Sequence, residues 1–123
     1  MKTKLNPIEL AGTTLILMTG LIHLIEAPDA FGEAPYKGIL FVLNGVGALI
    51  SAVGIFRGVR KKAWLLGIAV AGGSILGYIA SRTVGLPGIA PEPDAWLEPL
   101  GVASLVVEGL FVVLATKVLR TRR

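Results

Sequence analysis

Two charged residues stand inside otherwise apolar runs of the sequence, where a membrane would penalise them most. Arg82 lies near the end of the third run, and Glu108 lies in the middle of the fourth. A carboxylate far from water is costly unless it is protonated or lies beside a cation. Three interpretations are open: a buried ion pair that fixes two helices together, a site for a polar ligand or proton, and an outward-facing Arg82 that pairs with loop acids.

His23 and Glu26 form a second pair of reactive side chains, because residues three apart share one face of a helix. Two such residues can bind a metal. Further ligands would have to come from Glu108, Asp29 or Glu33, which are expected at different depths in the membrane. With one histidine and no cysteine, zinc, di-iron and haem sites are poorly supported, and we leave the cofactor unassigned. A histidine that is hydrogen-bonded within the bundle is the simpler interpretation.

The sequence contains no pattern typical of a catalytic centre. Ser81 and Ser104 are not surrounded by a nucleophile-elbow sequence, and the glycines lie within apolar runs rather than in a phosphate-binding loop. We therefore assign no catalytic residue and no metal ligand. An enzyme embedded in the membrane and acting on a lipid or quinone stays open as an alternative.

Four apolar runs must position these side chains, at roughly 7–27, 36–57, 63–85 and 96–118. Each run is close to the ~20 residues that a helix needs to cross the hydrocarbon core of a membrane. None has the polar face that a helix of a soluble bundle needs. The sequence therefore predicts an all-α fold, an integral membrane four-helix antiparallel bundle formed by residues 1–123 as a single transmembrane domain.

Basic residues are distributed unevenly around the four runs. The N-terminus, the 57–62 turn and the C-terminus hold ten of the twelve lysines and arginines, whereas the two other loops are acidic. The positive-inside rule then predicts a multi-pass protein of the cell membrane with both termini in the cytoplasm. The same rule explains the net charge of +4, so we expect the lipid bilayer as a partner and not nucleic acid.

Small and polar residues recur at helical spacing on each run, and we expect these faces to point into the bundle. The GxxxG spacings Gly54/Gly58 and Gly73/Gly77 indicate close helix packing, within one chain or in a dimer. Most strongly polar residues fall in the outer half of the membrane. The sequence predicts a ligand-binding polar cluster that opens toward the acidic loops: His23, Glu26, Asn44, Tyr78, Arg82, Ser104 and Glu108.

Helix ends and membrane interfaces have signals of their own. Asn6 and Glu9 have the types and spacing of a capping box at the start of the first run. Three aromatic residues lie near the ends of runs or in outer loops, and we interpret Phe31, Trp64 and Trp96 as anchors at the membrane–water interface.

The stretch SRTVGLPG at 81–88, with the acidic loop and Glu108 that follow, resembles small uncharacterised four-helix membrane proteins of bacteria and archaea that carry an SRTxGLP motif. The His23–Glu26 region is similar to that group too. More loosely, the four-span size and the run GILFVLNGVGALISAVGIFR resemble the DoxX family, which is linked to quinol oxidase subunits. The chain lacks a clear match to that family's carboxylate in the second helix. This likeness implies a redox-accessory role as an alternative.

Two classes of function follow from these observations. The leading hypothesis is a non-enzymatic membrane protein that binds or passes a small polar ligand or ion through the polar cluster. The alternative is a structural or accessory subunit of a larger membrane complex, in which the charges only fix helices together. A homo-oligomer is compatible with both hypotheses.

Overall fold

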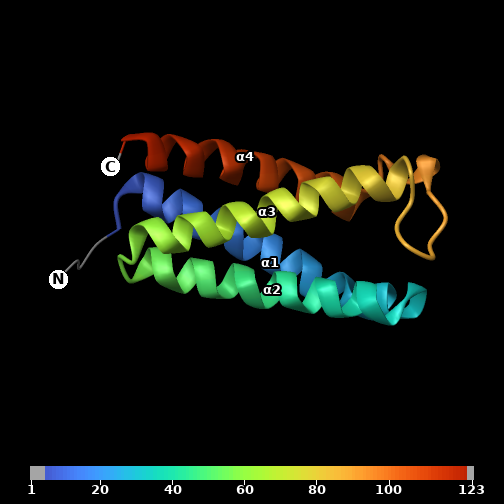
Figure 1. The fold of residues 1–123 in the computed structure, drawn as a ribbon. Coiled ribbons are helices and arrows are strands. Elements are labelled where there is room, and N and C mark those ends of the chain that lie inside the picture. Colours follow the sequence, from blue (N-terminus) through green and yellow to red (C-terminus); the bar gives the residue numbers. More distant parts are fainter. Residues whose placement is uncertain (1–4, 122–123) are drawn as a thin grey trace.

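The computed structural model describes residues 5–121, apart from the side chain at position 60, and the fold is built from helices (Figure 1). A single 3₁₀ turn, η1 (Pro93–Ala95), lies in the loop before the last helix. The prediction of an all-α fold with four long helices is confirmed. These helices are α1 (Pro7–Glu33), α2 (Pro35–Phe56), α3 (Arg60–Arg82) and α4 (Pro99–Thr121).

The start of α1 is fixed by the predicted capping box. Asn6 Oδ1 accepts a hydrogen bond from the backbone N–H of Glu9 (2.7 Å), and the backbone N–H of Asn6 donates to Glu9 Oε1 (3.2 Å). The two bonds satisfy backbone donors that a helix start leaves unpaired, so the first turn is stabilised locally.

α1 is longer than predicted, because Pro28 lies inside it without ending it. A proline in a helix interior removes one backbone hydrogen bond and crowds the preceding turn. Ala27 and Ala30 on either side are 5% and 3% exposed, so packing of this last stretch offsets that cost. α1 ends instead where Ala34 adopts the extended backbone that is favoured before Pro35.

The other three helices begin and end one to three residues from their predicted bounds. α3 begins directly after a turn at Gly58, whose φ of +84° is a backbone conformation that favours glycine. α4 begins at Pro99 rather than near residue 96, because residues 93–95 form the separate turn η1. Proline suits the first turn of a helix, where its missing N–H costs nothing.

Successive helices run antiparallel, and α4 returns beside α1, so the four helices close a ring (Figure 1). Each helix packs against its two neighbours in this ring, and the α1–α2 contact is the most extensive. The first and last described residues and the α2–α3 turn lie at one end of the bundle, the terminal end. The α1–α2 and α3–α4 connections lie at the other end, the loop end.

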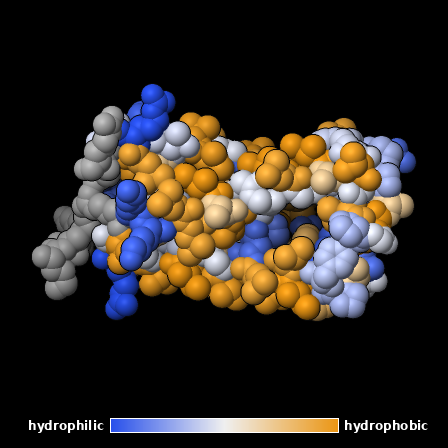
Figure 2. All heavy atoms as spheres, in the orientation of Figure 1, coloured by the Kyte–Doolittle hydropathy of each residue, from blue (hydrophilic) through white to orange (hydrophobic). Residues whose placement is uncertain are grey.

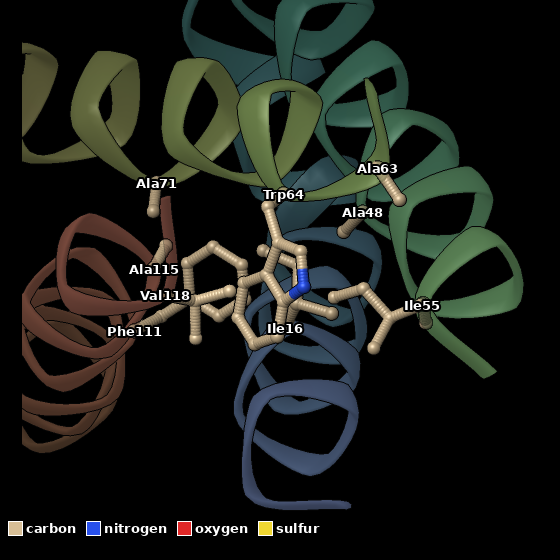
Figure 3. Packing of buried hydrophobic residues seen from close by; sticks show 10 residues of the cluster. Ile16, Ala48, Ile55, Ala63, Trp64, Ala71, Phe111, Ala115 and Val118 are labelled. Carbon is tan, nitrogen blue, oxygen red and sulfur yellow. The ribbon is translucent and has the colours of Figure 1, made fainter. Parts of the chain in front are cut away.

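An apolar core fills the bundle toward the terminal end (Figure 3). Trp64 of α3 is 1% exposed and stacks on Phe111 of α4, with ring centroids 5.5 Å apart. Gly12 of α1 makes room for the indole, since a Cβ at this position would lie 2.2 Å from Trp64 Cη2. The prediction that Trp64 is an interface anchor is therefore wrong, because its ring points inward and belongs to the core.

The two predicted GxxxG pairs have different roles. An added Cβ at Gly54 would lie 2.7 Å from Ala63 Cβ, so this glycine allows close packing of α2 on α3, whereas Gly58 forms the turn between them. An added Cβ at Gly73 or Gly77 would have no described atom within 4 Å, apart from its chain neighbours and the backbone of its own helix. Packing within one chain is therefore wrong for this second pair, which lines an open space, and its role in a dimer stays a prediction.

Apolar side chains cover the outside of the bundle between its two ends, as Figure 2 shows for one face. Ile25, Leu76 and Val113 are 65%, 70% and 69% exposed on three different helices. All four helices are long and apolar enough to cross a membrane. A soluble monomer rarely exposes apolar patches of this extent, so the composition is that of a multi-pass membrane protein.

Candidate functional site

A cavity of about 870 Å³ occupies the bundle toward the loop end. Its walls come from all four helices and from the α3–α4 loop. Figure 2 shows a hollow in the apolar surface with hydrophilic residues visible inside it. Six of the seven residues of the predicted polar cluster line the cavity: His23, Glu26, Asn44, Tyr78, Arg82 and Ser104.

His23 lies at the floor of the cavity, and its side chain contacts residues of α2 and α3 as well as of its own helix, α1. Its Nδ1–H donates to the Thr19 carbonyl (2.9 Å), and its Nε2 lies 3.2 Å from Ser74 Oγ on α3. Its ring centroid lies 5.0 Å from that of Phe41 on α2. Because a carbonyl can only accept, Nδ1 carries a proton in this arrangement. Residues of α1, α2 and α3 therefore fix the orientation of the imidazole together.

Glu108 lies below the cavity floor and is 1% exposed. Its Oε2 accepts a hydrogen bond from Ser104 Oγ one turn earlier on α4 (2.5 Å) and lies 3.8 Å from His23 Nδ1. Glu108 and His23 therefore form a buried ion pair, in which the histidine is charged when both ring nitrogens carry a proton.

Arg82 turns away from Glu108 and toward the loops. Its Nε donates to the Ala95 carbonyl (3.2 Å), and its Nη2 lies 3.7 Å from Glu98 Oε1. The guanidinium also covers the ring of Tyr78 at 3.7 Å from the centroid. Of the three interpretations of this arginine, the outward pairing with a loop acid is the one that the structure contains.

The buried pair between Arg82 and Glu108 is therefore wrong, and depth along the helix explains why. Arg82 is the last residue of α3. Ser74, which contacts the imidazole at the cavity floor, lies eight residues earlier, or about 12 Å along the helix axis. One carbonyl and one carboxylate of the loop, those of Ala95 and Glu98, are closer partners for the guanidinium than a carboxylate at that depth.

Asn44 completes the floor of the cavity from α2. Its Nδ2 donates to Ser74 Oγ (2.5 Å) and to the Val70 carbonyl (3.3 Å). Its Oδ1 is buried and accepts no hydrogen bond from the residues that the structure describes. A buried acceptor without a donor is costly, so a hydrogen-bond donor placed in the cavity beside Asn44 would be favoured.

The hydroxyl of Ser74 has two hydrogen-bond acceptors within reach, the Val70 carbonyl and His23 Nε2. Ser74 Oγ lies 3.0 Å from the Val70 carbonyl and 3.2 Å from His23 Nε2. When the hydroxyl donates to Nε2, the imidazole is neutral. When it donates to the carbonyl, the same oxygen is free to accept a hydrogen bond from a protonated Nε2, and an imidazole with both protons is a cation beside Glu108. The Ser74 hydroxyl can therefore hydrogen-bond to either charge state of His23.

Glu26 lies one turn closer to the loop end than His23 and forms part of the cavity wall. It is half-buried, and its carboxylate makes no hydrogen bond or ion pair with a residue between positions 5 and 121. Within the same range, no group of three or more histidine, aspartate or glutamate residues could hold a metal ion.

Two tyrosines hold the α3–α4 loop over the cavity. Tyr78 donates to the Trp96 carbonyl (2.5 Å), and Tyr36 of α2 donates to the Pro87 carbonyl (2.5 Å). The second bond joins segments 51 residues apart in the sequence and ties the loop to the start of α2. Trp96 and Phe31 are 38% and 45% exposed, and their role as interface anchors stays a prediction.

Sequence reasoning missed Ser74 and Tyr36. Ser74 had a usable signal, because it lies four residues before Tyr78 and eight before Arg82 and so shares their helix face. Tyr36 had none, since its partner is a backbone carbonyl in a distant loop. The structure thus divides the predicted cluster into a floor around His23 and a mouth around Arg82, with Glu26 in the wall.

No family model, curated protein or solved structure matches the chain. The likeness to proteins with an SRTxGLP motif and to the DoxX family therefore stays a prediction from the sequence.

Proposed function

We propose that this chain is a multi-pass membrane protein with both termini in the cytoplasm, and that it binds a small polar ligand in the cavity at its outer end. The orientation is supported by charge. The loop end is acidic, and the described basic residues at the terminal end satisfy the positive-inside rule. These residues are Arg57, Lys61, Lys62, Lys117 and Arg120.

The observation that carries the binding proposal is the cavity itself. Its volume of about 870 Å³ falls in the range of small-molecule sites, roughly 300–1,000 Å³. The same helices are close-packed toward the terminal end, so the open space is confined to the part of the bundle where polar residues gather.

Binding is better supported than passage across the membrane. Ile16, Trp64 and Phe111 are at most 1% exposed and lie in the core between the cavity and the terminal end. A ligand crossing the bundle would have to displace this packed cluster of large side chains. The cavity is therefore a site with access from its outer half.

Native mass spectrometry of the protein, gently extracted from its own membranes, tests this proposal. Gly73 lines the cavity and Gly72 does not, although an added Cβ would meet no described neighbour at either position. We expect the wild type and Gly72→Phe to carry the same small molecule and Gly73→Phe to have lost it. Wild-type protein without any added small-molecule mass would contradict the proposal, and a bound polypeptide would favour the accessory-subunit hypothesis instead.

A further inference from the structure

We propose that the ligand of this cavity is an organic cation with an apolar body, an inference that rests on the binding function proposed above. Three properties of the cavity lead to it: the charge of its lining, the position of its large apolar side chains relative to the acids of α1, and its size.

Carboxylates outnumber basic groups around the cavity. Lys37 forms an ion pair with Glu33, and Arg82 pairs with Glu98, so both cations among the described lining residues already have acidic partners. The lining therefore offers no unpaired cation to an anionic ligand, while carboxylates remain for a cationic one. The charged residues of the lining are Glu26, Asp29, Glu33, Lys37, Arg82, Glu92 and Glu98.

The acidic and apolar parts of the lining come from different helices. Glu26 and Asp29 belong to α1 and accept no hydrogen bond or ion pair from any residue of the described chain. The facing side, from α2 and α3, contributes the large apolar side chains Leu40, Leu43 and Val70, together with polar ones such as Asn44 and Ser74. A ligand that satisfies both sides has a positive group toward α1 and an apolar body toward α2 and α3.

The cavity is also open on its α2–α3 side. Leu40 and Leu43 are 56% and 59% exposed although they line it, and Gly73 and Gly77 contribute no side chain to close it. The hollow seen in Figure 2 has apolar residues above and below it and more hydrophilic residues toward the loop end. In a membrane this border faces lipid, so the apolar body of a ligand would not have to be surrounded by water.

The volume of the cavity fits an organic cation better than an inorganic one. A single metal ion fills only a small part of about 870 Å³, and the described residues contain no cluster of three metal-ligating side chains. The aromatic ring of Phe41 also lines the cavity, and the ammonium of Lys37 lies 5.6 Å from its centroid, so a cationic group is already accommodated beside this ring.

Tetraphenylphosphonium and tetraphenylborate provide a matched test, because the two ions share shape and size and differ in the sign of their charge. Each is titrated by calorimetry into the protein in phosphatidylcholine nanodiscs, with empty nanodiscs as the correction for partition into lipid. We expect saturable binding of the phosphonium and none of the borate. Equal binding of both ions, binding of the borate alone, or binding of neither would overturn the proposed ligand class.

Charge-removing variants locate the binding. Glu26→Gln and Asp29→Asn should each weaken phosphonium binding about tenfold, because each removes an unpaired charge at the site. Asp94→Asn is the control, since this loop acid does not line the cavity, and it should leave binding unchanged. An equal loss in all three variants would indicate a general surface potential and overturn the assignment.

The two proposals can fail separately. If native mass spectrometry finds a neutral or anionic molecule that is lost in Gly73→Phe, the cavity is a binding site and the cation inference is wrong. If wild-type protein carries no small molecule and binds neither probe ion, both proposals are wrong. Circular dichroism and size-exclusion chromatography of each variant separate a lost site from a lost fold.

Discussion

His23 is the residue through which the floor of the cavity is assembled. It hydrogen-bonds to Thr19 and Ser74, contacts the ring of Phe41, and lies 3.8 Å from the carboxylate of Glu108. Every one of the four helices therefore contributes to its surroundings. Such a network is stable only when its members are satisfied, so the loss of one partner should be measurable.

Ser104→Ala tests the partner of the buried carboxylate. The serine hydroxyl donates to Glu108 Oε2 at 2.5 Å, and its loss should lower the free energy of unfolding by about 1–3 kcal/mol. The measurement is reversible unfolding in mixed micelles. Thr14→Ala is the control, because this exposed hydroxyl bonds only to its own helix, and it should change stability little. A loss of similar size in both variants would contradict the assigned role of Ser104.

A double-mutant cycle tests which cation belongs to Glu108. Glu108→Gln and Arg82→Gln should be additive within about 0.5 kcal/mol, because these side chains share no contact. Glu108→Gln and His23→Gln should instead show a coupling energy above about 0.5 kcal/mol, because the two groups lie in one network. A coupling energy between Arg82 and Glu108, with none between His23 and Glu108, would contradict this account. It would support an ion pair between Arg82 and Glu108.

At the scale of elements, α3 changes character along its length. Its first half packs tightly: Trp64 fills the space above Gly12, and an added Cβ at Gly67 would lie 2.4 Å from Phe111 Cζ. Its second half has glycines at 73 and 77 without close neighbours and so leaves room for the cavity. One helix thus forms part of the close-packed core and one wall of the site.

Gly12→Leu tests the tight packing of that first half. The leucine would collide with the indole of Trp64, and overpacking of this kind costs about 1–3 kcal/mol of unfolding free energy. Gly72→Leu on α3 should cost much less, since an added Cβ there meets no described atom within 4 Å. Thermal unfolding in a mild detergent measures both. Equal tolerance of the two variants would mean that Trp64 does not occupy the core as described.

Patterns within single helices were predictable from the sequence, and contacts between distant segments were much less so. Apolar run length gave the four helices, the capping box at Asn6 gave the start of α1, and helical spacing placed six lining residues on inward faces. The sequence left the partner of Arg82 open, because it depends on how the loop carrying Glu98 folds back over α3.

Two further errors have the same origin. Trp64 lies beside basic residues near a helix end, which is typical of an interface anchor, and only the glycine on α1 reveals that its ring turns inward. Pro28 predicts a helix end, but packing of its neighbours keeps α1 continuous. In each case a contact with another segment, or the packing of the bundle, outweighed a local signal.

For the whole molecule, the proposed topology can be tested by cysteine labelling, because the natural chain has no cysteine. Asp94→Cys in the acidic loop should react with a membrane-impermeant maleimide in intact cells. Lys61→Cys at the terminal end should react only after the membrane has been opened. Labelling in the reverse pattern would invert the proposed orientation, and labelling of both positions in intact cells would contradict a single orientation.

The central claim is that the cavity between the four helices, toward the loop end, holds a bound molecule. An experimental structure of the protein, taken from its own membranes without added ligand, tests it most directly. The account predicts continuous non-protein density between Glu26 on α1 and Leu43 on α2, above the ring of His23. A cavity that holds only ordered water would contradict the claim. So would a structure in which the second half of α3 packs directly against α2 and closes the cavity.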